Sequence, residues 1–405
     1  MDRKAATGQD GGPLVTLYDE QLPPDNSYAF SPEELEEDEM ILNMGPQHPS
    51  THGVLRVELK TDGEIVKDAR PHIGYLHRNF EKHAENIDYQ GVIPFTDRMD
   101  YVGSMGNSLT YAMTVEKLLG IGVGERVAGI RVITAELQRI ASHLLAMGTY
   151  GMDIGAFTPF LLCFQQRERV LDLFEWLSGA RLLYNYNWVG GVSHDLPDGW
   201  TDRCTRFLDE FVPVLDEVDS LLSHNRIFIR RTADVGVIPP PMAVDYALSG
   251  PNLRGSGHDW DLRRDDPYLG YEGYDFDVIT GTGEHGPIGS CWDRYFVRVR
   301  EMYESVKIVR QALARLPAEG DVHENVPRFV RPKGGEAYLR TEAPRGELGF
   351  YIVAEPKKPI PYRVKGRSPC FVAMGLFHEI TRGEMIADII AIIGSLDIVL
   401  GEIDR

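Results

Sequence analysis

The chain has 405 residues, of which 43% are hydrophobic and 10% aromatic, and it carries a formal net charge of −19. A chain of this length and composition can bury a large core. The acidic excess argues against a nucleic-acid-binding protein, because proteins that bind phosphate backbones carry clustered Lys and Arg. No two of the four cysteines have CxxC spacing, which argues against a zinc or iron–sulfur site held by this chain alone. The longest apolar run, 386–400, contains two aspartates and is too short to span a membrane.

The N-terminal part of the chain combines an acidic segment with a stiff loop. Residues 1–40 contain eleven acidic and two basic residues, and we expect them to form a flexible acidic arm. Two prolines and two glycines in segment 43–53 exclude a helix and predict a loop that presents His48 and His52. Imidazoles titrate near neutral pH, so both side chains are candidates for proton transfer, with buried structural histidines as the equally weighted alternative.

A β-hairpin is predicted directly after this loop. Apolar and charged residues alternate over 55–60, Asp62-Gly63 supplies a turn, and a second strand begins at Ile65. Residues 41–97 are therefore expected to form an α/β region that holds the histidine-containing loop. No signal sequence precedes it, which favours a cytosolic environment.

Helical periodicity dominates the middle of the chain. The spacing of apolar residues predicts helices over 105–120, 125–147, 158–180, 201–224 and 290–316. We expect a bundle of long helices over 98–325, interrupted by a Gly-, Pro- and Asp-rich part, 225–287, that forms extended surface structure or an interface. The Gly-rich turn 120–124 joins two helices and does not follow a strand, which argues against dinucleotide binding.

One of these helices carries a polar stripe. Glu136, Arg139 and His143 lie on the same side of helix 125–147. The stripe is either a solvated ladder of ion pairs or a wall that faces a partner, and the pattern alone favours the ladder.

The C-terminal part, 326–405, is predicted to be a small mixed region. Short strands flank the turn 343–346, and a helix near 383–394 precedes a tail. The fold class is therefore α+β, with an N-terminal β-hairpin region, a central bundle of long helices and a small C-terminal mixed region. The sequence contains neither a serine-hydrolase elbow nor a phosphate-binding loop.

Several motifs resemble the 49-kilodalton, or D-type, subunit of respiratory complex I. They occur in the family order from residue 45 to the end of the chain, and include Gly45-Pro-Gln-His-Pro-Ser-Thr-His-Gly53, Pro71-His-Ile-Gly-Tyr-Leu-His-Arg78, Arg98-Met-Asp-Tyr101, Pro344-Arg-Gly-Glu-Leu-Gly349 and Gly401-Glu-Ile-Asp-Arg405. This family is similar in fold to the large subunit of nickel–iron hydrogenases, which holds its metals with two CxxC motifs. The matching positions here are Asp100, Gly103, Val399 and Glu402, so the resemblance implies no nickel site.

The resemblance implies the quinone-chamber subunit of a proton-translocating NADH–quinone oxidoreductase, without activity outside the complex. Matching the motifs gives His52 and Tyr101 as ligands of the quinone headgroup, Asp153 as the acid that contacts the histidine, and Leu400 as chamber lining. These residue types fit the chemistry, because a phenol and an imidazolium can donate to the two quinone carbonyls while a carboxylate keeps the histidine charged.

The resemblance also implies the partners. Arg78 and His143 are expected to face a 4Fe-4S cluster held by the adjacent B-type subunit, since a nearby cation favours the reduced cluster. The C-type subunit and the H-type membrane subunit complete the set, with quinone as substrate, no metal or cluster held by this chain, and a peripheral position on the cytoplasmic face of the bacterial cell membrane. Two alternatives stay open: a non-catalytic hydrogenase-like scaffold, and the same subunit in a complex fed by a donor other than NADH.

Overall fold

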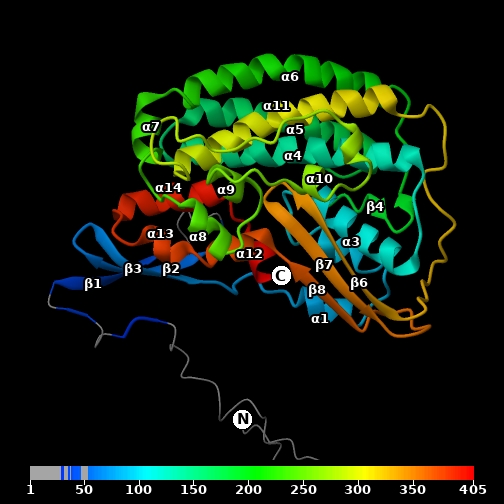
Figure 1. Ribbon diagram of the computed structural model, residues 1–405, viewed down its shortest axis with the longest axis horizontal. Coiled ribbons are helices and arrows are strands. Elements are labelled where there is room, and N and C mark those ends of the chain that lie inside the picture. The colour runs from blue at the N-terminus through cyan, green and yellow to red at the C-terminus, as the bar shows by residue number, and fades with distance from the viewer. Residues whose placement is uncertain (1–28, 32–34, 37, 47–52) are drawn as a thin grey trace, which may run out of the picture.

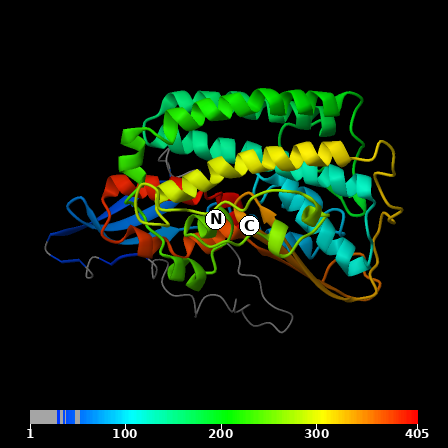
Figure 2. The ribbon, with the colours of Figure 1, turned by 45° about the horizontal axis from the view of Figure 1, so that its top comes forward.

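The computed structural model describes residues 29–31, 35–36, 38–46 and 53–405. Most of the predicted acidic arm, as well as His48 and His52, lies outside these residues. Four long helices form a bundle, and two three-stranded antiparallel sheets with several short helices lie against it (Figure 1, Figure 2). This arrangement confirms the α+β class.

The long helices run alternately in opposite directions. They are α4 (Glu125–Asp153), α5 (Phe157–Ser178), α6 (Trp200–Leu222) and α11 (Cys291–Arg315). α4 packs on both α5 and α11, and the apolar face that its sequence predicts is buried. Gly179, at φ 76°, ends α5, and the Ser290 hydroxyl caps α11 by accepting a hydrogen bond from the backbone N–H of Asp293. Four of the five predicted helices are thereby confirmed, and the fifth, predicted over 105–120, is α3 (Ser104–Leu119).

The N-terminal sheet contains the predicted hairpin and one further strand. β2 (Arg56–Asp62) and β3 (Ile65–His72) pair in antiparallel fashion through a turn at Gly63. β1 (Glu39–Met44) pairs with β2 and was not predicted. It includes Glu39 and Met40, which the charge pattern places in the arm, and Asn43 and Met44, which the proline pattern places in the loop. The sequence does not indicate β1 because its apolar residues do not alternate with polar ones.

The second sheet lies near the C-terminus. β6 (Gly335–Ala343), β7 (Gly346–Ala354) and β8 (Arg363–Arg367) are antiparallel in that order, and α3 (Ser104–Leu119) packs on β6 and β7. Four short helices follow: α12 (Pro369–Met374), α13 (Phe377–Thr381), α14 (Ile386–Leu396) and α15 (Leu400–Asp404). The predicted helix near 383–394 is confirmed as α14. The expected tail is instead the buried helix α15.

The segment 225–287, which its composition predicts to be extended surface structure or an interface, contains short helices joined by irregular segments. It contains α7 (Arg226–Thr232), α8 (Pro240–Asp245), α9 (Gly250–Gly255), α10 (Leu262–Asp265) and the 3-10 turn η3 (Tyr271–Gly273). Tyr271 is fully buried. Such short helices carry too few turns to show periodicity, and several polar residues of this segment are buried in ion pairs, so the sequence does not indicate these helices.

Four short elements complete the fold. α1 (Phe80–Ala84) contacts β8, and α2 (Ile93–Thr96) contacts α3. β4 (Asn187–Trp188) and β5 (Gly191–Val192) pair with each other between α5 and α6. Among the described residues, no helix is both long and apolar enough to cross a membrane.

Candidate functional site

Tyr101 lies in the turn between α2 and α3, partly buried against the main hydrophobic core. The carboxylate of Asp100 holds this turn, because its Oδ1 accepts a hydrogen bond from the backbone N–H of Val102 at 3.1 Å. Met99 belongs to a second core, which lies between α3 and the β6–β8 sheet. The turn is therefore fixed from both sides. Burial raises the pKa of Tyr101, so its phenol stays protonated and can donate a hydrogen bond.

α15 and the end of the histidine-containing loop meet this turn. A Cβ at Gly401 would lie 2.7 Å from the carbonyl oxygen of Met99, so only glycine allows the two backbones to approach so closely. A Cβ at Gly53 would lie 3.5 Å from Cδ1 of Leu400. Because Gly53 directly follows His52 in the sequence, the loop ends beside Leu400.

Three arginines form a surface pocket next to the Tyr101 turn. Arg78 is exposed, and its guanidinium donates a hydrogen bond to the carbonyl oxygen of Arg98. The pocket has a volume of about 200 Å³ and is lined by Arg78, Arg98 and Arg405 together with Phe80, His83 and Phe95. We call it the arginine pocket. Its positive charge attracts anionic groups.

Asp153 is the last residue of α4 and is partly buried. The end of α4 that carries it lies on the same side of the molecule as α7 and the β1–β3 sheet (Figure 1). One turn earlier, the ring of Tyr150 packs against α14, where a Cβ at Gly394 would lie 2.5 Å from Tyr150 Cδ2. The structure thus brings Leu400 and Arg78 to the Tyr101 turn, whereas Asp153 lies on a different element, at the end of α4.

Comparison with known proteins decides the family. Residues 153–334 and 327–405 match the family described as the 49 Kd subunit of respiratory-chain NADH dehydrogenase. The D-type subunit of the NADH-quinone oxidoreductase of Chlorobaculum tepidum is 53% identical over 374 residues, which are 92% of this chain and 94% of the relative. The same subunit of Prosthecochloris aestuarii is 54% identical with the same coverage. The chain belongs to this family. The resemblance in its motifs is thereby confirmed, and the protein is a subunit of complex I, an electron-transport enzyme.

Asp100, Gly103, Val399 and Glu402, the positions that the resemblance sets against the hydrogenase cysteines, lie together in the interior. Cys370 bridges two of them, since its Sγ accepts a hydrogen bond from Val399 N at 3.4 Å and its backbone N–H donates to Glu402 at 3.4 Å. Burial and the nearby Asp100 raise the pKa of Glu402 to about 7. Gly103 leaves room for the Asp100 carboxylate, which a Cβ there would approach to 2.3 Å. Within the described part of the chain, no three His, Cys, Asp or Glu residues are placed to hold a metal ion.

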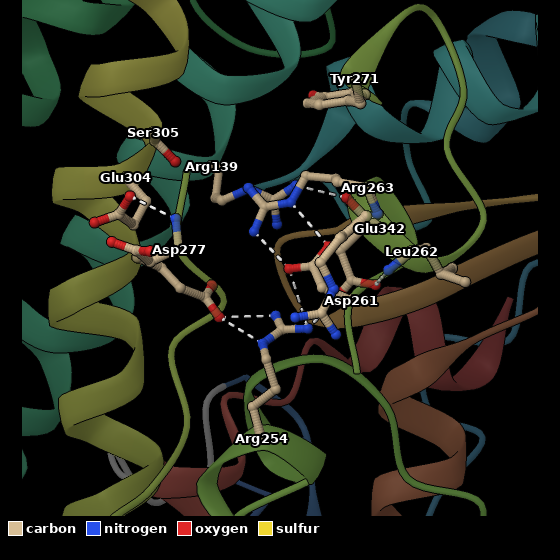
Figure 3. Close-up of polar contacts among 12 residues, drawn as sticks. Arg139, Arg254, Asp261, Leu262, Arg263, Tyr271, Asp277, Glu304, Ser305 and Glu342 are labelled. Carbon is tan, nitrogen blue, oxygen red and sulfur yellow. Dashed lines mark hydrogen bonds and ion pairs between the residues drawn. The ribbon is translucent and has the colours of Figure 1, made fainter. Parts of the chain in front are cut away.

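The pattern of the α4 polar stripe favours a solvated ladder of ion pairs, and this prediction is wrong. Glu136, Arg139 and His143 are all buried. Glu136 accepts hydrogen bonds from the hydroxyls of Tyr271 and Ser305, both at 2.7 Å. It also pairs with Arg139 and Arg263, each at 3.1 Å; Figure 3 shows this region. Burial alone would raise the pKa of Glu136, but the two guanidinium groups lower it to about 2.

The same ion cluster extends to the other end of the stripe. Arg254 pairs with Glu301 at 2.7 Å and with Glu342 at 2.8 Å, and Nε2 of His143 lies 3.0 Å from Glu301. Burial lowers the pKa of His143. The side chain of His143 has no exposed surface in this chain, so no partner group can contact it directly. The polar stripe therefore faces the interior of the chain. We refer to these residues as the α4 ion cluster.

The sequence motifs do not indicate Arg345, a further residue beside the Tyr101 turn. Arg345 lies at the tip of the β6–β7 hairpin, and its guanidinium pairs with Asp100 at 2.7 Å. Its only signal in the sequence is its place in the segment Pro344–Gly349, which supports the family match but gives no hint that the arginine is buried.

Proposed function

We propose that this chain forms the quinone-reducing site of a proton-translocating NADH–quinone oxidoreductase, with the headgroup bound between His52 and Tyr101. The observation that carries the proposal is the convergence of the Tyr101 turn, Leu400 and the end of the histidine loop at Gly53. Quinone reduction consumes two electrons and two protons, so the site needs a donor for each carbonyl oxygen. The protonated phenol of Tyr101 serves one oxygen and the imidazole of His52 the other, while Asp153 favours the charged imidazole.

Electrons reach this quinone from a 4Fe-4S cluster of the B-type subunit, which docks over the arginine pocket. The positive charge of Arg78 and its neighbours favours the reduced form of that cluster. His143 is buried and can act on the cluster only through the long-range field of its charged form. The C-type and H-type subunits are the other partners, and the chain sits peripherally on the cytoplasmic face of the bacterial cell membrane.

The proposal is tested with Tyr101→Phe in the intact complex in membranes. Loss of the phenolic proton donor should lower quinone reduction about 100-fold, the usual contribution of a positioned acid. Electron transfer from NADH to an artificial acceptor, which bypasses the quinone, should stay normal and so report on assembly. Tyr362→Phe, at a side chain that is 64% exposed, is the matched control.

Normal quinone reduction in the Tyr101→Phe complex would contradict the site assignment and favour the non-catalytic scaffold. A complex that reduces quinone but does not oxidise NADH would instead favour the alternative electron donor.

A further inference from the structure

The tip of the β6–β7 hairpin carries an arginine into the interior of the molecule. The two strands are joined by two residues, the second of which is Arg345. The tip is held closely on one side, because a Cβ at Gly250 would lie 2.3 Å from Cα of Gly346. The hydroxyl of Ser249 also accepts a hydrogen bond from the backbone N–H of Glu347 at 3.0 Å. The backbone of Arg345 therefore has a fixed position.

The guanidinium of Arg345 is 2% exposed and joins three segments that are far apart in the sequence. Nη1 donates to Oδ2 of Asp100 at 2.7 Å and to the hydroxyl of Ser142, on α4, at 3.0 Å. Nε donates to the carbonyl oxygen of Asp397 at 2.9 Å, and Nη2 donates to Oδ1 of the same residue at 3.1 Å. Because the guanidinium is planar and rigid, these bonds fix the three segments relative to one another.

Two of the three segments carry parts of the proposed quinone site. Asp100 uses one carboxylate oxygen for Arg345 and the other for the backbone of Val102, so Tyr101 lies inside a turn closed by this carboxylate. Asp397 ends α14 with φ 53° and therefore sets the direction in which the chain continues to Leu400. A displacement of the guanidinium would shift both Tyr101 and Leu400.

We propose that Arg345 is a positioning residue for quinone reduction, which sets the separation between the phenol of Tyr101 and the chamber wall at Leu400. This inference rests on the proposed function. It goes beyond a role in stability, because it requires the geometry of the planar group and not only its positive charge between Asp100 and Asp397.

The test compares variants of the intact complex in membranes. Arg345→Met alone leaves Asp100 buried without its cation and is expected to reduce assembly. Arg345→Met combined with Asp100→Asn removes that charge imbalance without restoring the hydrogen bonds, so the complex should assemble. Its kcat/KM for a short-chain quinone, per assembled complex, should fall about 10- to 100-fold, as displacements of about 1 Å do at reactive centres. Arg345→Lys keeps the positive charge but not the planar set of donors, so this complex should assemble and still show most of this loss.

Arg382→Met, at a side chain that is 58% exposed, is the control for loss of an arginine and should behave like the wild type. Wild-type kcat/KM in the double variant would show that Arg345 only balances charge, which would overturn the proposal. If the double variant does not assemble, Asp100→Asn alone decides, because it weakens the pair while keeping Arg345; unchanged kcat/KM would again overturn the proposal.

Tyr101→Phe in the same series separates the two hypotheses. If Tyr101→Phe lowers quinone reduction and the Arg345 variants do not, only the positioning role fails. If Tyr101→Phe has no effect either, the proposed function fails with it.

Discussion

Arg345 and Arg78 lie on either side of the turn that carries Tyr101, and one is buried while the other is exposed. Arg345 is buried, and its donors bind Asp100, Asp397 and a serine hydroxyl. Arg78 is exposed beside the same turn, and its guanidinium contacts a backbone carbonyl at the rim of the arginine pocket. A buried guanidinium with anionic partners fixes geometry, whereas a surface guanidinium keeps donors and charge available for a partner. The difference separates residues that build the site from residues that face another subunit.

The largest effect is expected from breaking the buried side of this comparison at Glu136. Glu136→Gln leaves Arg139 and Arg263 without their shared carboxylate in the interior, which should cost about 3 to 5 kcal/mol. Hydrogen exchange of α4 peptides in the intact complex measures the loss of protection. Glu168→Gln, whose side chain is 56% exposed in an ion pair with Arg181, should cost less than about 1 kcal/mol. Equal exchange in both variants would contradict the stabilising role of the α4 ion cluster.

The same carboxylate predicts a pH dependence. The pKa of Glu136 is about 2 in the folded chain, against an ordinary value of 4.5. A lowered pKa means that the folded state favours the ionised form, so the stabilisation is fully present above pH 4.5 and is lost as the pH falls toward 2. In the wild type, the protection factors of α4 peptides, which correct for the intrinsic pH dependence of exchange, should therefore fall over this window. Glu136→Gln should reduce that dependence, and Glu301, whose pKa is also lowered, should account for the remainder.

The α4 ion cluster also shows how far the sequence could predict this molecule. Long helices repeat a buried apolar face over many turns, so α4, α5, α6 and α11 could be located from periodicity. The polar stripe could not be interpreted, because the partners of Glu136 other than Arg139 follow it by 127 to 169 positions, on α10, η3 and α11. Periodicity within one helix cannot tell whether a charged face meets water or a distant countercharge. Tyr101 and Leu400 could be indicated by family motifs. The role of Arg345 could be inferred only from the structure, because its partners Asp100 and Asp397 are distant in the sequence.

Asp97 and Asp100 sharpen the comparison, because both are buried near Tyr101 and only Asp100 pairs with Arg345. Asp97 accepts a hydrogen bond from the backbone N–H of Asn185 at 2.6 Å, and burial raises its pKa to about 7. A raised carboxylate pKa means that the folded state favours the proton, so stability falls as the pH rises from 3.8 to about 7.

Asp97→Asn cannot ionise and should remove this loss, which stabilises the complex by about 4 kcal/mol at pH 8 and changes little at pH 4. Thermal inactivation of the intact complex at the two pH values measures the difference. Equal gains at both values would show that the carboxylate does not titrate in this range.

The smallest effect is expected on the exposed side, where Arg78→Met should leave assembly intact. Suppose that the arginine pocket faces a partner's cluster, with about 10 Å between the guanidinium and the cluster. At an effective dielectric constant of about 20, loss of this positive charge then destabilises the reduced cluster relative to the oxidised one by about 2 kcal/mol. A redox titration of that cluster in the membrane-bound complex should therefore show a lower midpoint potential. His143→Met is the informative comparison, because burial lowers the pKa of His143 and leaves it neutral at pH 7, so its removal should not change the potential there. A shift in the His143 variant and none in the Arg78 variant would reverse the assignment, and would show that the buried group, not the surface one, sets the field at the cluster.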